Sequence, residues 1–189
     1  MIAVWIVIGV VVLLVVALVL SYNGLVRLRN EVNTGWANID VQLKRRTDLI
    51  PNLVETVKGY AAHEKGVFES VTEARSSLMK ADTPGAAAQA NDMLTSALGR
   101  LFAVAEAYPE LKASQNFLAL QNQLTDTEDT IAAARRYYNA TVMRYNTKIQ
   151  SLPPALYAGA LGFKAREFFS VEEADRAVPQ VEFTPQTPQ

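Results

Sequence analysis

Three consecutive cations, Lys44, Arg45 and Arg46, are the residues in this sequence best suited to recognise another charged group. They lie in a stretch, DVQLKRRTDLIPNLVETVKGYAAHEKG, whose apolar residues recur at helical spacing. Lys44 and Arg45 fall outside the apolar phase and are candidate residues for binding an acidic partner protein. The alternative is a solvated face on which nearby aspartates pair with them for only a few tenths of a kcal/mol. Arg46 falls within the apolar phase, so we expect it to be buried and paired with a glutamate such as Glu106.

Residues that could catalyse a reaction or hold a metal are scarce. The chain has one histidine, His63, and no cysteine, which removes thiolate ligands and thiol nucleophiles. A di-iron site in a helical bundle needs Glu-x-x-His twice, but Tyr60 stands three residues before His63. Phosphate-binding glycine loops and nucleophile motifs are absent from the sequence. We therefore expect no enzyme, no cofactor and no metal, with carboxylates converging from separate helices as the remaining enzymatic alternative.

Residues 1–21 predict a transmembrane anchor. The first twenty residues, MIAVWIVIGVVVLLVVALVL, carry no charge and would span about 30 Å as a helix, which matches the bilayer core. A cleavable signal peptide is the alternative, but no basic residue precedes the apolar run and no small-x-small cleavage site follows it. Arg27 and Arg29 follow the span, so the positive-inside rule predicts a single-pass protein of the cell membrane, with its N-terminus outside and the rest cytoplasmic. The near balance of 18 Lys and Arg with 19 Asp and Glu argues against a nucleic-acid partner.

The region 22–152 predicts an all-α fold, namely an antiparallel four-helix bundle with two long and two short helices. A single helix over 22–81 would reach about 90 Å, too long to pack against the helices of about 36 and 62 Å that follow. A chain reversal within Gly59–Gly66 gives lengths of about 57, 24, 36 and 62 Å, which do close into a bundle. We expect Pro51 to kink the first helix, and Pro109 to begin the last one. Pro153 and Pro154 should end it.

The segment 153–176 is expected either to lie at the membrane interface or to cap the open end of the bundle. Residues 177–189 are expected to form a flexible tail. A Tyr-Asn pair occurs twice in the last helix, at 138–139 and 145–146, and once at 22–23. We interpret these tyrosines as aromatic core and the amides as groups that set the helix register. The candidate membrane-interface residues are Leu156, Tyr157, Leu161, Phe163, Lys164, Arg166, Phe168 and Phe169.

Several motifs together resemble the LemA family, in family order, from the anchor to about Phe183. They are YNGLVRLRN, GWANIDVQLKRRTDLIPNLVETVKGYAAHEK, EAYPELKAS, FLALQNQL, RRYYNA and GFKAREFF. The resemblance implies a bacterial single-pass membrane protein with an antiparallel four-helix bundle and no established enzymatic activity. The family includes magnetosome-associated proteins, which implies a role in membrane organisation or assembly.

Two non-enzymatic functions follow from these observations. The first is a membrane-anchored adaptor or scaffold that binds a partner protein at the inner face of the cell membrane. The second is a self-assembling structural protein, a homo-oligomer in which small side chains let helices from different copies approach closely. Those small residues are Ala86, Ala87, Ala90, Ala97, Ala132 and Ala133.

Overall fold

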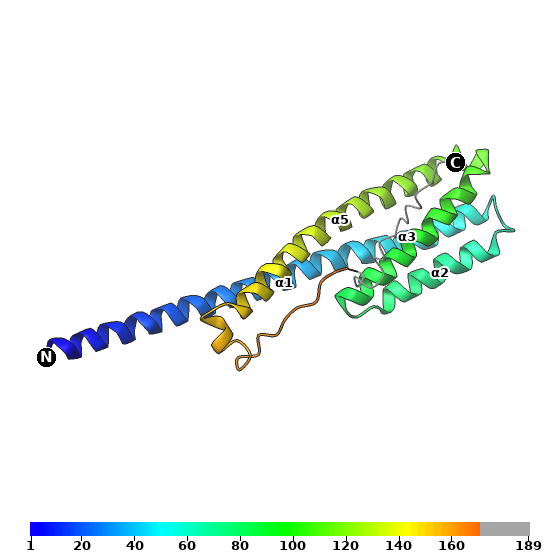
Figure 1. Ribbon diagram of the computed structural model, residues 1–189. Helices are drawn as coiled ribbons and strands as arrows, with labels where there is room; N and C mark the ends of the chain where they lie inside the picture. Colours follow the sequence, from blue (N-terminus) through cyan, green and yellow to red (C-terminus); the bar gives the residue numbers. More distant parts are fainter. Residues whose placement is uncertain (171–189) are drawn as a thin grey trace, which may run out of the picture.

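The computed structural model describes residues 1–170, which contain helices and no strand (Figure 1). The expected all-α class is confirmed for this part of the chain. Positions 171–176 of the predicted interfacial segment, and the predicted tail 177–189, lie outside the described residues. The elements are α1 (Ile2–Lys58), α2 (Lys65–Lys80), α3 (Pro84–Glu106), α4 (Pro109–Lys112), α5 (Gln115–Gln150) and the 3-10 turn η1 (Pro154–Leu156).

The helix α1 is continuous over 57 residues and joins the apolar N-terminal stretch to the rest of the protein. Every residue up to Leu20 is exposed, and the first buried residue is Leu25. An 18-residue window of α1 has a mean hydropathy of 3.4 and no buried residue, so this helix could cross a membrane. Pro51 lies inside α1 without ending it, and the chain reverses between Lys58 and Lys65 as expected.

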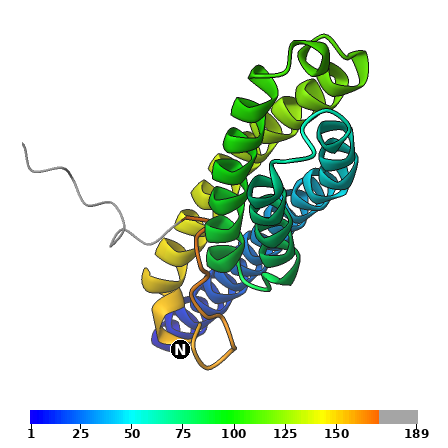
Figure 2. The same ribbon diagram turned by 90° about the vertical axis from the view of Figure 1, so that its right-hand side faces the viewer.

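The helix α5 runs back along α1, whereas α2 and α3 form a hairpin against the half of α1 far from the N-terminus (Figures 1 and 2). The apolar periodicity explains this packing, because the in-phase residues form one core. That core includes Ile39, Ile50, Leu94 and Val142, each at most 1% exposed. Thr83 begins α3 as an N-cap that accepts a hydrogen bond from the Ala86 amide, with Pro84 next to it.

The start of the last long helix differs from the prediction. Pro109 begins the four-residue helix α4, which ends at Lys112, and α5 begins only at Gln115. Ser114 has an extended backbone conformation between the two helices, and the fully buried Leu111 holds α4 against the core. Proline favours the first turn of a helix but does not determine how far that helix continues.

After η1 the chain forms two further parts. Residues 152–161, which we call the elbow, turn beside the point where α1 leaves the apolar stretch. Residues 163–169, which we call the strap, then run in extended conformation over α1 and α5 towards the start of α3 (Figure 1). The strap therefore covers the part of the α1–α5 pair that the α2–α3 hairpin leaves open.

Candidate functional site

Two asparagines on α5 hold the strap by its backbone. The side-chain oxygen of Asn146 accepts a hydrogen bond from the Arg166 amide at 2.8 Å, and its amide nitrogen donates to the Arg166 carbonyl at 2.9 Å. Asn139 binds the amide and carbonyl of Phe169 in the same way, at 2.9 and 3.1 Å. Each asparagine thus pairs with the strap as a neighbouring strand would. We expected these amides to set the register between helices, but Asn139 and Asn146 bind the strap instead.

A third contact connects the strap to two helices at once. The Tyr138 hydroxyl donates a hydrogen bond to the Glu167 carbonyl at 2.8 Å. The Glu167 side chain accepts from the Gly85 amide at 3.2 Å, at the start of α3. The first turn of α3 has no acidic residue of its own, so Glu167 places a negative charge at its positive end. Burial raises the pKa of both Tyr138 and Tyr145 above its ordinary value.

Two of the predicted membrane-interface residues are buried inside the protein instead. The Phe163 ring packs edge-on against Tyr22 at 5.8 Å and lies under the Arg29 guanidinium at 4.9 Å. Phe169 packs against Trp36, with ring centroids 6.2 Å apart. Their exposed fractions are 3% and 1%, so the prediction that Phe163 and Phe169 form part of a membrane-interface surface is wrong. Both rings pack against residues of α1, whereas the backbone of the strap is hydrogen-bonded to α5.

Arg166 and Phe168 lie in the strap, beside the part of α1 that follows the apolar stretch. Arg166 donates a hydrogen bond to the Asn33 side chain at 3.1 Å. Asn33 lies twelve residues after Ser21, which is about 18 Å along the helix from the end of the apolar stretch. Phe168 is exposed but lies two residues further from the elbow. The placement of Arg166 and Phe168 at a membrane interface stays a prediction. Leu156, Leu161 and Lys164 remain exposed near the elbow, and Tyr157 is half-buried there.

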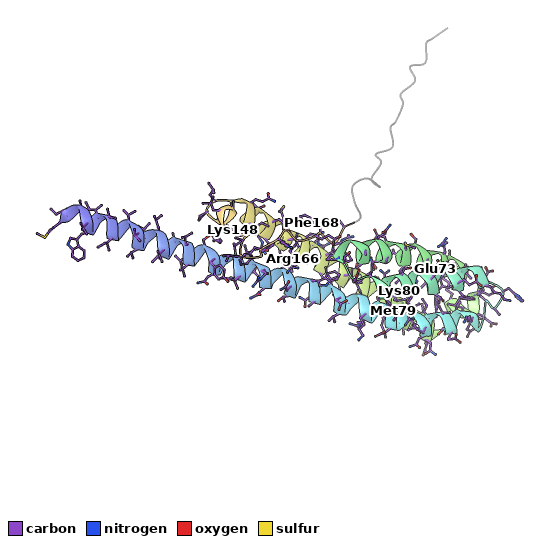
Figure 3. All side chains as sticks on the ribbon, turned by 90° about the horizontal axis from the view of Figure 1, so that it is seen from below. Glu73, Met79, Lys80, Lys148, Arg166 and Phe168 are labelled. Carbon is purple, nitrogen blue, oxygen red and sulfur yellow. The ribbon has the colours of Figure 1, made fainter. Side chains whose placement is uncertain are left out.

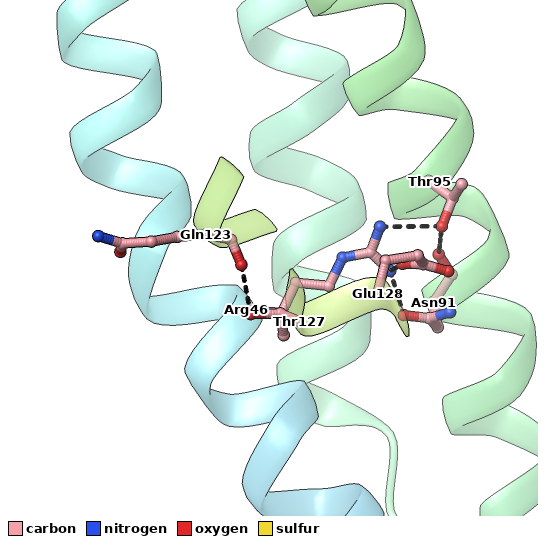
Figure 4. A network of polar contacts seen from close by, with 6 residues as sticks. All are labelled: Arg46, Asn91, Thr95, Gln123, Thr127 and Glu128. Atoms are coloured by element: carbon pink, nitrogen blue, oxygen red, sulfur yellow. Dashed lines mark hydrogen bonds and ion pairs between the residues drawn. The ribbon is translucent and has the colours of Figure 1, made fainter. Parts of the chain in front are cut away.

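Arg46 forms the main polar cluster inside the domain (Figure 4). Its guanidinium makes an ion pair with Glu128 of α5, with Nη1 and Oε2 2.7 Å apart. It also donates hydrogen bonds to the side chains of Asn91 and Thr95, the latter at 3.0 Å. Burial lowers the pKa of Arg46, and the nearby carboxylates of Glu128 and Asp92 oppose that effect. An arginine remains charged under such shifts, so the ion pair with Glu128 persists. The cluster therefore connects α1, α3 and α5 through side-chain contacts.

The expected burial and pairing of Arg46 are confirmed, but the suggested partner is wrong. Glu106 pairs instead with Lys112, across the α3–α4 connection. It lies eleven residues after Thr95, about 16 Å further along α3 than the Arg46 side chain reaches. Which glutamate faces Arg46 depends on the relative positions of α1 and α5.

Lys44 and Arg45 are exposed, and neither makes an ion pair within residues 1–170. Lys44 lines a cavity of about 230 Å³ between α1 and the end of α2. Buried Leu43 and Leu78 supply apolar walls, and the charged lining residues are Asp40, Lys44 and Asp48. The cavity therefore combines apolar walls with two carboxylates and one ammonium group at its edge. Arg45 does not line it.

The described residues offer no cluster of three or more histidine or carboxylate groups that could hold a metal. His63 is exposed in the turn between α1 and α2, as expected of a turn residue. Among the small residues suggested for contacts between copies, Ala87, Ala90 and Ala97 are buried within the chain. They allow α3 to pack closely inside the protein and are not available to a second copy.

The fold and these surfaces define a class of protein: a membrane-associated, all-helical protein whose apolar helix continues into its folded domain. The LemA family model matches residues 35–183, which is most of the chain, and this protein belongs to the LemA family. It is 27% identical to the magnetosome protein MamQ of Magnetospirillum gryphiswaldense, over 85% of this chain and 68% of that protein.

Two further relatives agree with this assignment. Magnetosome protein MamQ 2 of Paramagnetospirillum magneticum is 28% identical, over 87% of this chain and 70% of that protein. Protein LemA of Metamycoplasma hominis is 28% identical, over 82% of this chain and 71% of that protein. The residues that the family model matches, 35–183, include the strap as well as most of the helical domain.

Proposed function

We propose that this protein is a non-enzymatic, membrane-anchored scaffold that holds a partner protein at a set height above the inner face of the cell membrane. The observation that carries the proposal is the continuity of α1 from the apolar stretch to Lys58. Residues 22–58 span about 55 Å as a helix. Because no loop separates anchor from domain, a partner on the domain is held at a defined distance from the bilayer.

The helices α1, α2, α3 and α5 would act as an antiparallel four-helix bundle, stiffened by the Arg46 cluster and the strap. The orientation we propose has the N-terminus outside the cell and this bundle in the cytoplasm. Arg27 and Arg29, six and eight residues beyond Ser21, support that orientation through the positive-inside rule.

The partner-binding face we propose is centred on Lys44 and Arg45. Both cations are exposed, and Lys44 adjoins the 230 Å³ cavity described above. An acidic partner segment that also carries an apolar side chain would complement this face. Exposed charges contribute more to the rate and specificity of association than to affinity, so the apolar cavity would supply the stronger contact.

The test is chemical cross-linking in native membranes, followed by purification of this protein and mass spectrometry. The variant is Lys44→Glu/Arg45→Glu, and its matched control is Arg135→Glu/Arg136→Glu, an exposed cation pair on α5. We expect a distinct protein to be lost from the first variant and kept in the control. If that protein is lost from both variants or kept in both, the proposal that the face around Lys44 and Arg45 binds the partner is refuted.

A second outcome would favour the alternative, a self-assembling structural protein involved in membrane organisation. Its support is the similarity to proteins named for the magnetosome. Cross-links that join only copies of this chain, unchanged by either substitution, would favour that homo-oligomer over the scaffold. Stoichiometric metal in the purified protein, measured by elemental analysis, would instead contradict the non-enzymatic assignment.

A further inference from the structure

The elbow exposes three leucines beside the end of the apolar stretch. Leu156 is 80% exposed, and Leu152 and Leu161 are more than half exposed. The Tyr157 hydroxyl donates a hydrogen bond to the Ser21 side chain at 2.8 Å, which places the elbow level with the last turn of that stretch. Large apolar side chains gathered at this level are typical of a surface that meets a membrane.

A groove separates the elbow from α1. It has a volume of about 330 Å³ and an almost wholly apolar lining formed by Leu18, Val19, Tyr22, Tyr157 and Leu161. Leu18 and Val19 belong to the helical stretch that can cross the bilayer, so the groove is continuous with the surface that faces hydrocarbon. The component that reaches such a groove is the acyl chain of a lipid.

The charges around the elbow suit lipid headgroups. From Tyr145 to Arg166 the sequence contains three cations and no Asp or Glu. Lys148, in the last turn of α5 (Figure 3), and Lys164, at the start of the strap, flank the elbow in the sequence. Such cations attract the phosphates of anionic lipids.

We propose that the elbow lies at the boundary between headgroups and hydrocarbon, and that a phospholipid acyl chain fills the groove between Leu161 and the last turns of the transmembrane helix. Lys148 and Lys164 contact the lipid phosphate. The elbow is then a second membrane contact, which fixes how the domain is tilted on its anchor. This inference does not depend on the proposed scaffold role.

The first test measures depth in the bilayer. The chain has no cysteine, so Leu156→Cys and Leu161→Cys each provide one labelling site for the fluorophore NBD in the full-length protein. The control is Leu118→Cys, an exposed leucine at the far end of α5. In phosphatidylcholine–phosphatidylglycerol vesicles, we expect lipids with a spin label on the acyl chain to quench NBD at 156 and 161 several-fold more than at 118. Iodide quenching at all three sites without lipid quenching would overturn the proposal.

The second test concerns the groove itself. Leu161→Trp fills it, whereas Leu118→Trp adds the same side chain far from it. Native mass spectrometry of protein released in mild detergent should show phospholipid adducts for the wild type and for Leu118→Trp, reduced several-fold for Leu161→Trp. Equal adducts in all three would overturn the acyl-chain site. Circular dichroism of each variant establishes that its helices are intact.

Discussion

At the scale of single residues, Arg46 shows how a charge is accommodated in a helical core. Its side chain is 4% exposed, and burying an unpaired guanidinium would cost several kcal/mol. Glu128 offsets part of that cost through an ion pair, and Asn91 and Thr95 offset a further part through hydrogen bonds. A buried ion pair adds little net stability compared with an apolar packing, but breaking it is costly. The cluster therefore penalises any sliding of α1 against α3 and α5.

Glu128→Gln should lower the free energy of unfolding by about 2 kcal/mol. Removing one partner of a fully buried pair costs about 3–5 kcal/mol, and the 40% exposure of Glu128 reduces that figure because water screens the pair. Denaturant titration of the protein in detergent micelles, followed by circular dichroism, measures the change. Glu55→Gln is the control, because its pair with Lys58 is exposed and should contribute less than about 1 kcal/mol. Equal effects of the two substitutions would contradict the structural role of the cluster.

At the scale of elements, the strap depends on a match between two backbone repeats. Asn139 and Asn146 are seven residues apart on α5, which is about 10.5 Å. The residues they bind, Arg166 and Phe169, are three apart in extended chain, which is about 10 Å. A helix can therefore present side-chain amides at the spacing that an extended segment requires. This match explains how a segment without helix or sheet partners can cover α1 and α5.

Asn146→Ala and Asn139→Ala should release the strap locally. Each removes two hydrogen bonds, each worth about 0.5–1.5 kcal/mol, so the strap should open more often while the helices stay folded. Hydrogen exchange with mass spectrometry should show faster exchange in peptides covering 163–169. Asn116→Ala, an exposed asparagine in the first turn of α5, is the matched control and should leave that exchange unchanged. Unchanged exchange in all three variants would show that the asparagines do not hold the strap.

At the scale of the whole molecule, the protein is elongated because α1 is. The apolar stretch, the strap-covered middle and the α2–α3 hairpin lie in that order along one helix (Figure 1). The turn between α1 and α2 therefore lies at the opposite end of the described chain from the apolar stretch (Figure 1). Rigid connection to the anchor is what distinguishes this arrangement from a domain attached by a flexible linker.

A fluorophore on Ala62→Cys, in that turn, should lie about 55 Å from the bilayer surface. Energy transfer to dye-labelled headgroups in nanodiscs measures the distance. Five glycines inserted after Asn23 should shorten the mean distance and broaden its distribution, because they break the connection between anchor and domain. A label already close to the headgroups in the wild type would contradict the upright helix.

Much of the helical fold could be predicted from the sequence because it depends on local properties. Apolar periodicity identified the buried face that includes Ile39 and Leu53, and the glycines at 59 and 66 bracketed the reversal. The same periodicity placed Arg46 inside the protein. Twenty uncharged residues determined that the N-terminal helix is long and apolar enough to cross a membrane. Each conclusion needs only neighbours within a few turns of one helix.

Only the tertiary structure decided which residues meet across the chain. Glu128 rather than Glu106 faces Arg46, because the partner depends on how α5 is placed against α1. Phe163 and Phe169 point inwards because asparagines on α5 hold the strap at residues 166 and 169. An extended segment without regular alternation carries no local signal for which side it buries. Its orientation comes from hydrogen bonds between residues 20 to 30 positions apart, and only the folded chain brings these together.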